Sequence, residues 1–190
     1  MKAFGFLSFG HYGHGRGPGD PNAAQALKDA VEIAVGADEI GVNGAYWRVH
    51  HYARQAAAPI PLLSTAGART KRIEVGTGVI DMRYENPLYL AEEVAALDLL
   101  TDQRIAIGIS RGSPEQARRG WETFGYTGSA DPRGADVARA HTTQFLDAIR
   151  GVPQADLDTS GGMAPGASSR LRIEPHAPGV DRRLWWGAGS

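Results

Sequence analysis

Three clusters between residues 46 and 113 carry most of the information about the fold: Trp47-Arg48-Val49-His50-His51-Tyr52, Gly76-Thr77-Gly78-Val79-Ile80 and Gly108-Ile109-Ser110-Arg111-Gly112-Ser113. Each cluster closes a segment with the pattern of a β-strand and opens a loop before a helix. In parallel α/β folds such loops gather at the carboxyl ends of the strands, where ligands bind. A histidine pair, a glycine turn and an Arg-Gly-Ser turn at one edge indicate a phosphate-bearing cofactor with an acid or base beside it.

Strands and helices alternate through most of the chain. Strands are predicted at 4–9, 46–49, 73–80, 105–109 and 184–186, the first of them as a buried strand. Helices are predicted at 21–40, 59–70, 87–100, 114–120 and 136–150. Asp20-Pro21 and Asn86-Pro87 each supply a cap and a first-turn proline. The repeated β-α order predicts a parallel sheet with right-handed crossovers.

The length of the chain bounds the architecture. A closed (β/α)8 barrel needs roughly 200 residues and typically about 250, whereas this chain has 190 residues. We therefore predict one α/β domain over 1–190 of the (β/α)8 TIM-barrel type, which forms an incomplete N-terminal part of about five strands, with 114–182 as an irregular insertion. Because open sheet edges favour association, a homo-oligomer or a chain that completes the barrel is expected.

Composition excludes several classes of function. The chain has 20 Lys and Arg against 21 Asp and Glu, so neither nucleic acid nor an anionic membrane is a favoured partner. It has no signal-peptide pattern, and no run approaches the ~20 apolar residues of a membrane helix, so a cytoplasmic protein is expected. The chain has no Cys. No metal site is predicted, because His11 and His14 have no further ligands at suitable spacing.

Two groups of residues suggest chemistry on their own. Successive strand positions point to opposite sides, so only one of His50 and His51 can face the interior, where it could donate or accept a proton. The alternative is a pair that only hydrogen-bonds loop backbone. Arg111 offers a planar fork of donors to phosphate, Gly112 allows close approach, and Ser113 adds an amide and a hydroxyl. The alternative is a solvated arginine in a tight turn.

The chain resembles the luciferase-like flavin-dependent monooxygenases, a family that includes bacterial luciferase and deazaflavin-using relatives. The pieces that match occur in family order and spacing from about residue 3 to the last residue. They are Val49 to Tyr52, Ala68 to Ile73, Gly76 to Ile80, Asn86 to Glu93, Leu99 to Arg104, Gly108 to Ser113, and Trp185 to Ser190.

The resemblance implies a (β/α)8 barrel with the flavin at its C-terminal rim. It implies that His50 is the catalytic histidine at the flavin and that Gly78-Val79 is a non-proline cis peptide beneath the ring. The phosphate is expected at Arg111, Gly112 and Ser113 and, after the fifth strand, at Gly189 and Ser190. The expected substrate pocket contains His11, Tyr12 and His51.

The implied activity is a monooxygenase reaction on a small organic substrate with dioxygen and reduced FMN, which a separate flavin reductase supplies. Two alternatives stay open at this point. One is hydride transfer with a deazaflavin in place of FMN and without oxygen. The other is a half-barrel without catalysis that binds flavin or serves as an assembly partner.

Overall fold

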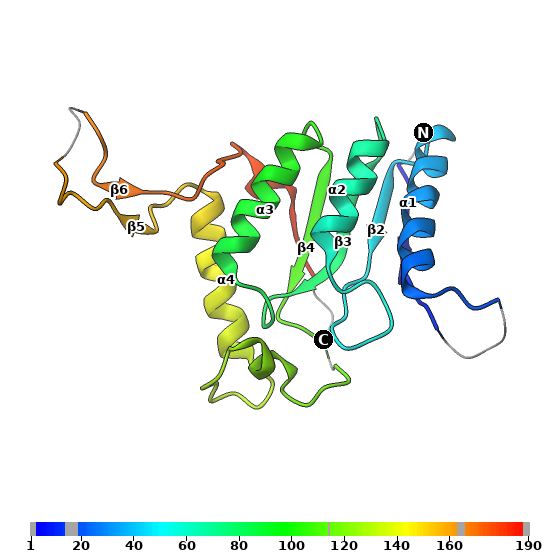
Figure 1. Ribbon diagram of the computed structural model, residues 1–190, viewed down its shortest axis with the longest axis horizontal. Coiled ribbons are helices and arrows are strands. Elements are labelled where there is room, and N and C mark those ends of the chain that lie inside the picture. The colour runs from blue at the N-terminus through cyan, green and yellow to red at the C-terminus, as the bar shows by residue number, and fades with distance from the viewer. Residues whose placement is uncertain (1–2, 14–18, 114, 163–165, 188–190) are drawn as a thin grey trace.

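The computed structural model describes residues 3–13, 19–113, 115–162 and 166–187. At its centre is a parallel sheet of five strands in the order β1-β2-β3-β4-β7 (Figure 1). The strands are β1 Gly5–Ser8, β2 Gly44–Trp47, β3 Glu74–Asp81, β4 Ile105–Ser110 and β7 Leu184–Trp186. Because strand order follows chain order, successive β-α units lie side by side and their strands end at one common rim.

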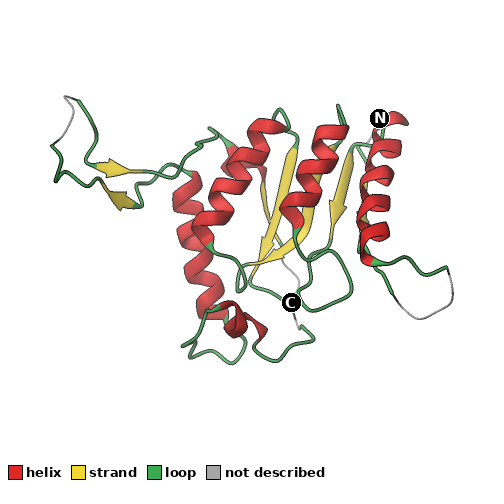
Figure 2. Cartoon of the chain, viewed as in Figure 1, coloured by secondary structure: helices red, strands yellow, loops and turns green. Residues whose placement is uncertain are grey.

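The helices cover one face of this sheet (Figure 2). They are α1 Ala23–Glu39, α2 Pro59–Arg69, α3 Pro87–Leu100 and α4 Ala135–Ile149, and each packs against the next. The predicted cap of α3 is confirmed, since the side chain of Asn86 accepts the N–H groups of Leu88 and Tyr89. The predicted Asp20-Pro21 cap of α1 is wrong: Asn22 accepts the N–H of Gln25 instead.

The two faces of the sheet differ in side-chain size. Large side chains such as Trp47, Ile105 and Ile107 point toward the helices and are fully buried. The opposite face of β4 carries the small residues Ala106, Gly108 and Ser110, which suit the crowded interior of a barrel. Together with the parallel order, this arrangement confirms an α/β fold with the N-terminal part of a (β/α)8 barrel.

The prediction of a buried first strand is wrong. β1 lies at an edge and pairs only with β2 among the described residues. Phe4 is 59% exposed and Leu7 is 48% exposed. An edge strand lacks a neighbour on one side, so apolar composition alone does not bury it.

The predicted helix at 114–120 is also wrong over its described residues, 115–120. They form bends and turns that lead into a 3-10 helix, η1 Gly120–Phe124. The backbone of Arg119 is left-handed, with φ of 51°, which a continuing α-helix excludes. Its guanidinium holds this geometry by donating to the Glu122 carboxylate at 2.8 Å and to the carbonyl of Ser129 at 3.1 Å.

The segment from 151 to 179, predicted as irregular, contains one short antiparallel ribbon. Its strands are β5 Ala155–Asp156 and β6 Arg170–Leu171, and it projects from the main body (Figure 1). The 3-10 helix η2 Val180–Arg183 then leads into β7, which pairs with β4 and confirms the predicted fifth strand. Among the residues the structure describes, no helix has the length and apolar character to cross a membrane.

Candidate functional site

A polar pocket of about 290 Å³ lies at the carboxyl ends of β2, β3 and β4, the lower edge of the sheet in Figure 1. Its lining includes five of the residues predicted from the sequence: His50, Gly78, Val79, Gly112 and Ser113. Arg48 and Glu115 line it as well. The three sequence clusters therefore meet in space, as their positions after successive parallel strands predicted.

His50 is held between a cation and a carboxylate. The Nε–H of Arg48 donates to Nε2 of His50, and Nδ1 of His50 lies 3.2 Å from Oε1 and 3.3 Å from Oε2 of Glu115. A guanidinium has donors only, so Nε2 must be the acceptor and Nδ1 must carry the proton that it donates to Glu115. The pocket thus fixes both the orientation and the tautomer of this ring.

Glu115 is well buried, with only 4% of its side chain exposed against 15% for His50. Burial raises the pKa of the Glu115 carboxyl, and the hydrogen bond from His50 opposes that shift. Desolvation is the larger of the two effects, so the pKa of the Glu115 carboxyl stays above its ordinary value. A buried acid of this kind beside a titratable ring is typical of sites that transfer protons.

A buried ion pair connects the end of β3 to the loop that contains Gly112 and Ser113. The Arg83 Nε lies 2.9 Å from Oδ1 of Asp81, and its Nη2 donates to the carbonyl of Ser113 at 2.8 Å. A Cβ added to Gly112 would lie 2.3 Å from the Arg83 guanidinium, and its φ is +91°, so both space and backbone require glycine there. The Arg-Gly-Ser turn is thereby held against β3.

The predicted cis peptide is confirmed: the bond between Gly78 and Val79 is cis. The pairing of β3 with β4 also shifts register between Thr77 and Ile80, an irregularity that a glycine in a strand permits. Gly78 and Val79 both line the His50 pocket, so this stretch of β3 forms part of its wall.

Arg111 lies in a neighbouring chamber of about 670 Å³. This chamber shares Gly112, Ser113 and Glu115 with the His50 pocket, so His50 and Arg111 occupy the same rim of the sheet. Gly189 and Ser190, predicted to hold phosphate, lie outside the described residues.

His51 points away from the pocket. Its ring stacks on Tyr84, with centroids 4.2 Å apart, and Nε2 lies 4.0 Å from Oε1 of Glu85. Burial lowers the pKa of His51. Burial raises the pKa of Glu85 to about 7, with Glu93 and Asp81 adding to the shift. At neutral pH this cluster therefore holds an uncharged ring beside a carboxyl that is partly protonated.

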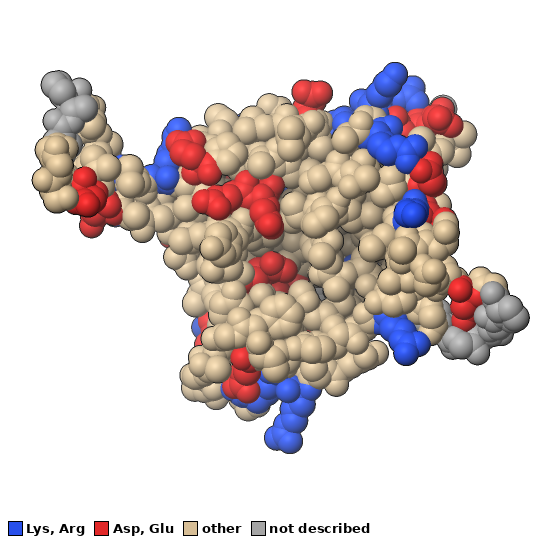
Figure 3. Space-filling view, viewed as in Figure 1, with Lys and Arg blue, Asp and Glu red and all other residues tan. Residues whose placement is uncertain are grey.

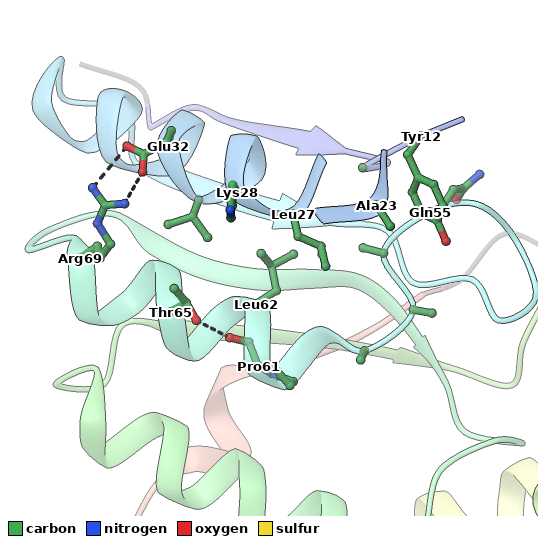
Figure 4. A pocket seen from close by; sticks show the side chains of 15 residues that line it. Tyr12, Ala23, Leu27, Lys28, Glu32, Gln55, Pro61, Leu62, Thr65 and Arg69 are labelled. Atoms are coloured by element: carbon green, nitrogen blue, oxygen red, sulfur yellow. Dashed lines mark hydrogen bonds and ion pairs between the residues drawn. The ribbon is translucent and has the colours of Figure 1, made fainter. Parts of the chain in front are cut away.

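The other two predicted substrate residues lie elsewhere. Tyr12 lines a cavity of about 510 Å³ between α1 and α2, whose walls include Leu27 and Leu62 (Figure 4). His11 stacks on Phe9 and its Nε2 lies 2.7 Å from the side-chain nitrogen of Gln55. The structure therefore brings neither residue into the His50 pocket.

Sequence reasoning missed Arg48, Glu115 and the Asp81–Arg83 pair. The sequence contains a signal for Arg48, because it lies two positions before His50 and residues two apart on an extended strand point to the same side. Glu115 is hidden because the segment after Ser113 has the sequence pattern of a helix. Nothing local in the sequence pairs Glu115 with a histidine 65 residues earlier.

The residues present fit a flavin phosphate compound. The rim offers an arginine, a glycine turn with positive φ and a Ser113 hydroxyl for phosphate, and the end of β3 at Gly78 and Val79 lines the adjoining pocket. Among the described residues no group of three or more His, Asp or Glu side chains could hold a metal ion.

The chain belongs to the luciferase-like monooxygenase family, whose family profile matches residues 2–190. It is 31% identical over 109 residues to 4-hydroxyprotoasukamycin monooxygenase of Streptomyces nodosus subsp. asukaensis, covering 56% of this chain and 29% of that protein. It is 27% identical over 139 residues to the oxygenase component of the flavin-dependent trigonelline monooxygenase of Acinetobacter baylyi. That match covers 72% of this chain and 36% of that protein.

A second type of relative is named as F420-dependent. The chain is 30% identical over 93 residues to the F420-dependent glucose-6-phosphate dehydrogenase of Amycolatopsis mediterranei, covering 45% of this chain and 27% of that one. The chain thus spans about a third of the length of these curated relatives.

Solved structures confirm the fold. The oxygenating constituent of 3,6-diketocamphane monooxygenase from Pseudomonas putida, solved in complex with FMN, superposes with a TM-score of 0.68 at 18% identity. The match covers 93% of this chain and 49% of that structure.

Proposed function

We propose that this chain serves a flavin-dependent monooxygenase reaction, in which reduced FMN and dioxygen oxidise a small organic substrate. The observation that carries the proposal is His50, fixed in one tautomer between Arg48 and Glu115 in a pocket that shares three residues with the Arg111 chamber. The monooxygenases among the relatives support the reaction class.

The protein's part is to bind the cofactor and handle protons. When bound, reduced FMN supplies the two electrons for the reduction of dioxygen. Arg111, Gly112 and Ser113 would hold the phosphate, and Gly78 and Val79 would line the space for the ring system. His50 exchanges a proton at Nε2 once the Arg48 guanidinium moves aside, and Glu115 stabilises the charged imidazole from the Nδ1 side. The guanidinium of Arg48 has a second contact available, because it already lies 5.3 Å from the Phe9 ring centroid.

Two partners belong to this proposal. A separate reductase supplies reduced FMN, as the relative named an oxygenase component supports. A second copy or another chain covers the sheet edges, because Leu7 on β1 and Trp185 on β7 are 48% and 65% exposed. Light scattering on the purified chain tests the second copy, and a monodisperse monomer would exclude it.

The experiment that tests the cofactor compares riboflavin, FMN and the variant Arg111→Gln by fluorescence titration. FMN should bind with quenching of its fluorescence, and the variant should weaken FMN binding about tenfold while leaving riboflavin binding unchanged, because riboflavin lacks the phosphate. Equal losses for both flavins, or no binding of either, would contradict the assignment.

The competing reaction is hydride transfer with a deazaflavin, which the F420-dependent relative supports. Oxygen consumption separates the two. With reduced FMN, the monooxygenase proposal predicts oxygen uptake coupled to product formation in a substrate screen. Turnover with reduced deazaflavin under anaerobic conditions, and none with FMN and oxygen, would favour the alternative. Flavin binding without either activity would leave a binding or assembly role.

A further inference from the structure

The cavity that contains Tyr12 takes no part in the proposed flavin reaction. It has a volume of about 510 Å³ and lies between α1 and α2, on the face of the sheet that the helices cover (Figure 4). None of its lining residues lines the His50 pocket or the Arg111 chamber. A cleft of ~300–1,000 Å³ with mainly apolar walls and a small number of polar groups is typical of sites for small molecules.

The two helices give this cavity apolar walls. Leu27 and Val31 come from α1, and Pro61 and Leu62 come from α2. Figure 4 shows the side chains of Leu27 and Leu62 pointing toward one another across the gap. Leu27 is 47% exposed, so the cavity leaves apolar surface in contact with water. In Figure 3 the surface over the middle of α2 is mostly tan, and charged side chains lie closer to the upper ends of α1 and α2.

Small residues keep one end of the cavity open. Ala23 is the first residue of α1, and Ala56 to Ala58 form the segment that leads into α2. An alanine side chain ends at Cβ, so none of these four residues reaches across the gap. Tyr12 and Gln55 lie at this end of the cavity (Figure 4). The space between the helices is therefore wide enough for an apolar chain that enters between Leu27 and Leu62.

One cation that lines the cavity lacks a counter-ion. Lys28 lies on α1, and the carboxylate four positions later on the same helix face is Glu32. Glu32 is already paired, because Arg69 of α2 donates to both of its oxygens, with Nη2 3.3 Å from Oε2. This pair lies at the other end of the cavity (Figure 4). Within the described part of the chain, the Lys28 ammonium therefore has no hydrogen-bond or ion-pair partner.

We infer that this cavity binds an amphipathic carboxylate, a ligand with an unbranched alkyl chain and one terminal carboxylate. The alkyl chain lies between Leu27 and Leu62 and extends toward Ala23, and the carboxylate pairs with Lys28. The charge of the cavity selects the head group, because two cations and one carboxylate line it and leave one positive charge without a partner. The inference goes beyond the proposed function, because the cavity shares no residue with the flavin site.

Isothermal titration of decanoate, below the concentration at which it forms micelles, tests the head group. We expect one site per chain, and weaker binding of decylammonium, which has the same alkyl chain and the opposite charge. Lys28→Gln should weaken decanoate binding about fivefold and remove the preference for decanoate over decylammonium. The control Lys71→Gln removes another exposed lysine that does not line the cavity, and it should bind as the parent does.

A second pair of variants tests the position of the alkyl chain. In Ala23→Phe the new ring occupies part of the cavity, and decanoate affinity should fall at least about tenfold because apolar contact with the chain is lost. The matched control Ala24→Phe places the same ring at the next position of α1, which does not line the cavity, and it should leave binding unchanged. Both alanines are exposed, and thermal unfolding verifies that each variant is folded.

The inference is overturned if the parent binds no decanoate, if decylammonium binds as tightly as decanoate, or if Ala23→Phe and Ala24→Phe behave alike. A dimer that binds no decanoate and that Ala23→Phe dissociates would instead assign the cavity to an interface between two copies of this chain. Titration of FMN separates this inference from the proposed function. FMN binding without decanoate binding would contradict this site alone, and decanoate binding without FMN binding would contradict the proposed function alone.

Discussion

Asp38 and Glu115 are buried carboxylates at opposite ends of one sheet, and they have different partners. Asp38, at the N-terminal end, accepts the backbone N–H groups of Lys71 at 2.8 Å, Arg72 at 3.0 Å and Ile73 at 2.8 Å. Glu115, at the C-terminal end, faces the Nδ1 of His50. One carboxylate fixes the course of the chain, whereas the other sets the state of a titratable ring.

The residues near Asp38 and those near Glu115 differ in the same way. At the N-terminal end, Arg104 donates to the carbonyls of Gly67, Thr70 and Ile73, so its hydrogen bonds also hold the backbone in place. At the C-terminal end, His51 leaves Nε2 without a hydrogen bond and Glu85 has a strongly raised pKa. In barrels of this type the N-terminal end stabilises and the C-terminal end reacts. The distribution of partners around the carboxylates reproduces that division in this chain.

The largest expected effect is at the N-terminal end. Asp38→Asn should lower the free energy of unfolding by about 3 kcal/mol at pH 7, because it weakens three hydrogen bonds from backbone to a charged acceptor. Flavin affinity should not change. Urea denaturation measures the first and fluorescence titration the second.

The pH dependence of that effect has a definite sign. Burial raises the pKa of Asp38, but the three backbone N–H groups and Arg72 outweigh it, so the pKa lies below 3.8. The stabilisation is therefore complete above pH 3.8 and is lost as the pH falls through the folded-state pKa. A difference between parent and variant that stays constant down to pH 2 would contradict this account.

The next effect is at His50. His50→Gln should slow the product-coupled reoxidation of bound reduced FMN about 100-fold, and Glu115→Gln should slow the same step about tenfold. Both should change the free energy of unfolding by less than about 1 kcal/mol. Stopped-flow absorbance with oxygen gives the rates. If Glu115→Gln instead lowers the free energy of unfolding as much as Asp38→Asn does and leaves the rate unchanged, the two ends do not differ as described.

Glu85 sharpens the comparison because its pH dependence is opposite to that of Asp38. Its pKa is raised from 4.5 to about 7, so the folded state favours the neutral acid. Stability from this group is complete below pH 4.5 and is lost as the pH rises through 7. Glu85→Gln should therefore stabilise the chain by about 2 kcal/mol at pH 8 and hardly at pH 4.5. The exposed Glu39→Gln serves as control, and equal effects in both variants would refute the assignment.

The smallest effect concerns Gly78 in the wall of the His50 pocket. In Gly78→Ala the new Cβ would meet only the flexible Leu7 side chain, at 2.9 Å from Cδ1, so stability should fall by less than about 1 kcal/mol. FMN affinity should fall about tenfold, because the methyl group occupies the approach of the ring. The control Gly36→Ala lies in α1 with open space around it and should stabilise by about 1 kcal/mol without affecting binding. Equal FMN affinity in all three proteins would remove Gly78 from the site.

The sequence predicts the elements that repeat and misses those that depend on distant contacts. Alternating apolar patterns and Asn86-Pro87 located the strands and α3, because those signals act within a few residues. The burial of β1 and the course of 115–120 depend on neighbours far along the chain, so local patterns gave the wrong answer for both. For the same reason the sequence yielded His50 and Arg111 but not Glu115, whose partner is 65 residues away.

The guanidinium of Arg83 joins two segments that are separate in sequence, the loop after β4 and the segment before α4. Besides its bond to Asp81, it donates to the carbonyls of Ser113 at 2.8 Å and Arg133 at 3.0 Å. The loop that carries Glu115 and the segment that opens α4 are therefore tied to one rigid strand end. Movement of either segment away from β3 would break a hydrogen bond to this guanidinium, so the Arg-Gly-Ser turn and the start of α4 keep a fixed spacing at the rim.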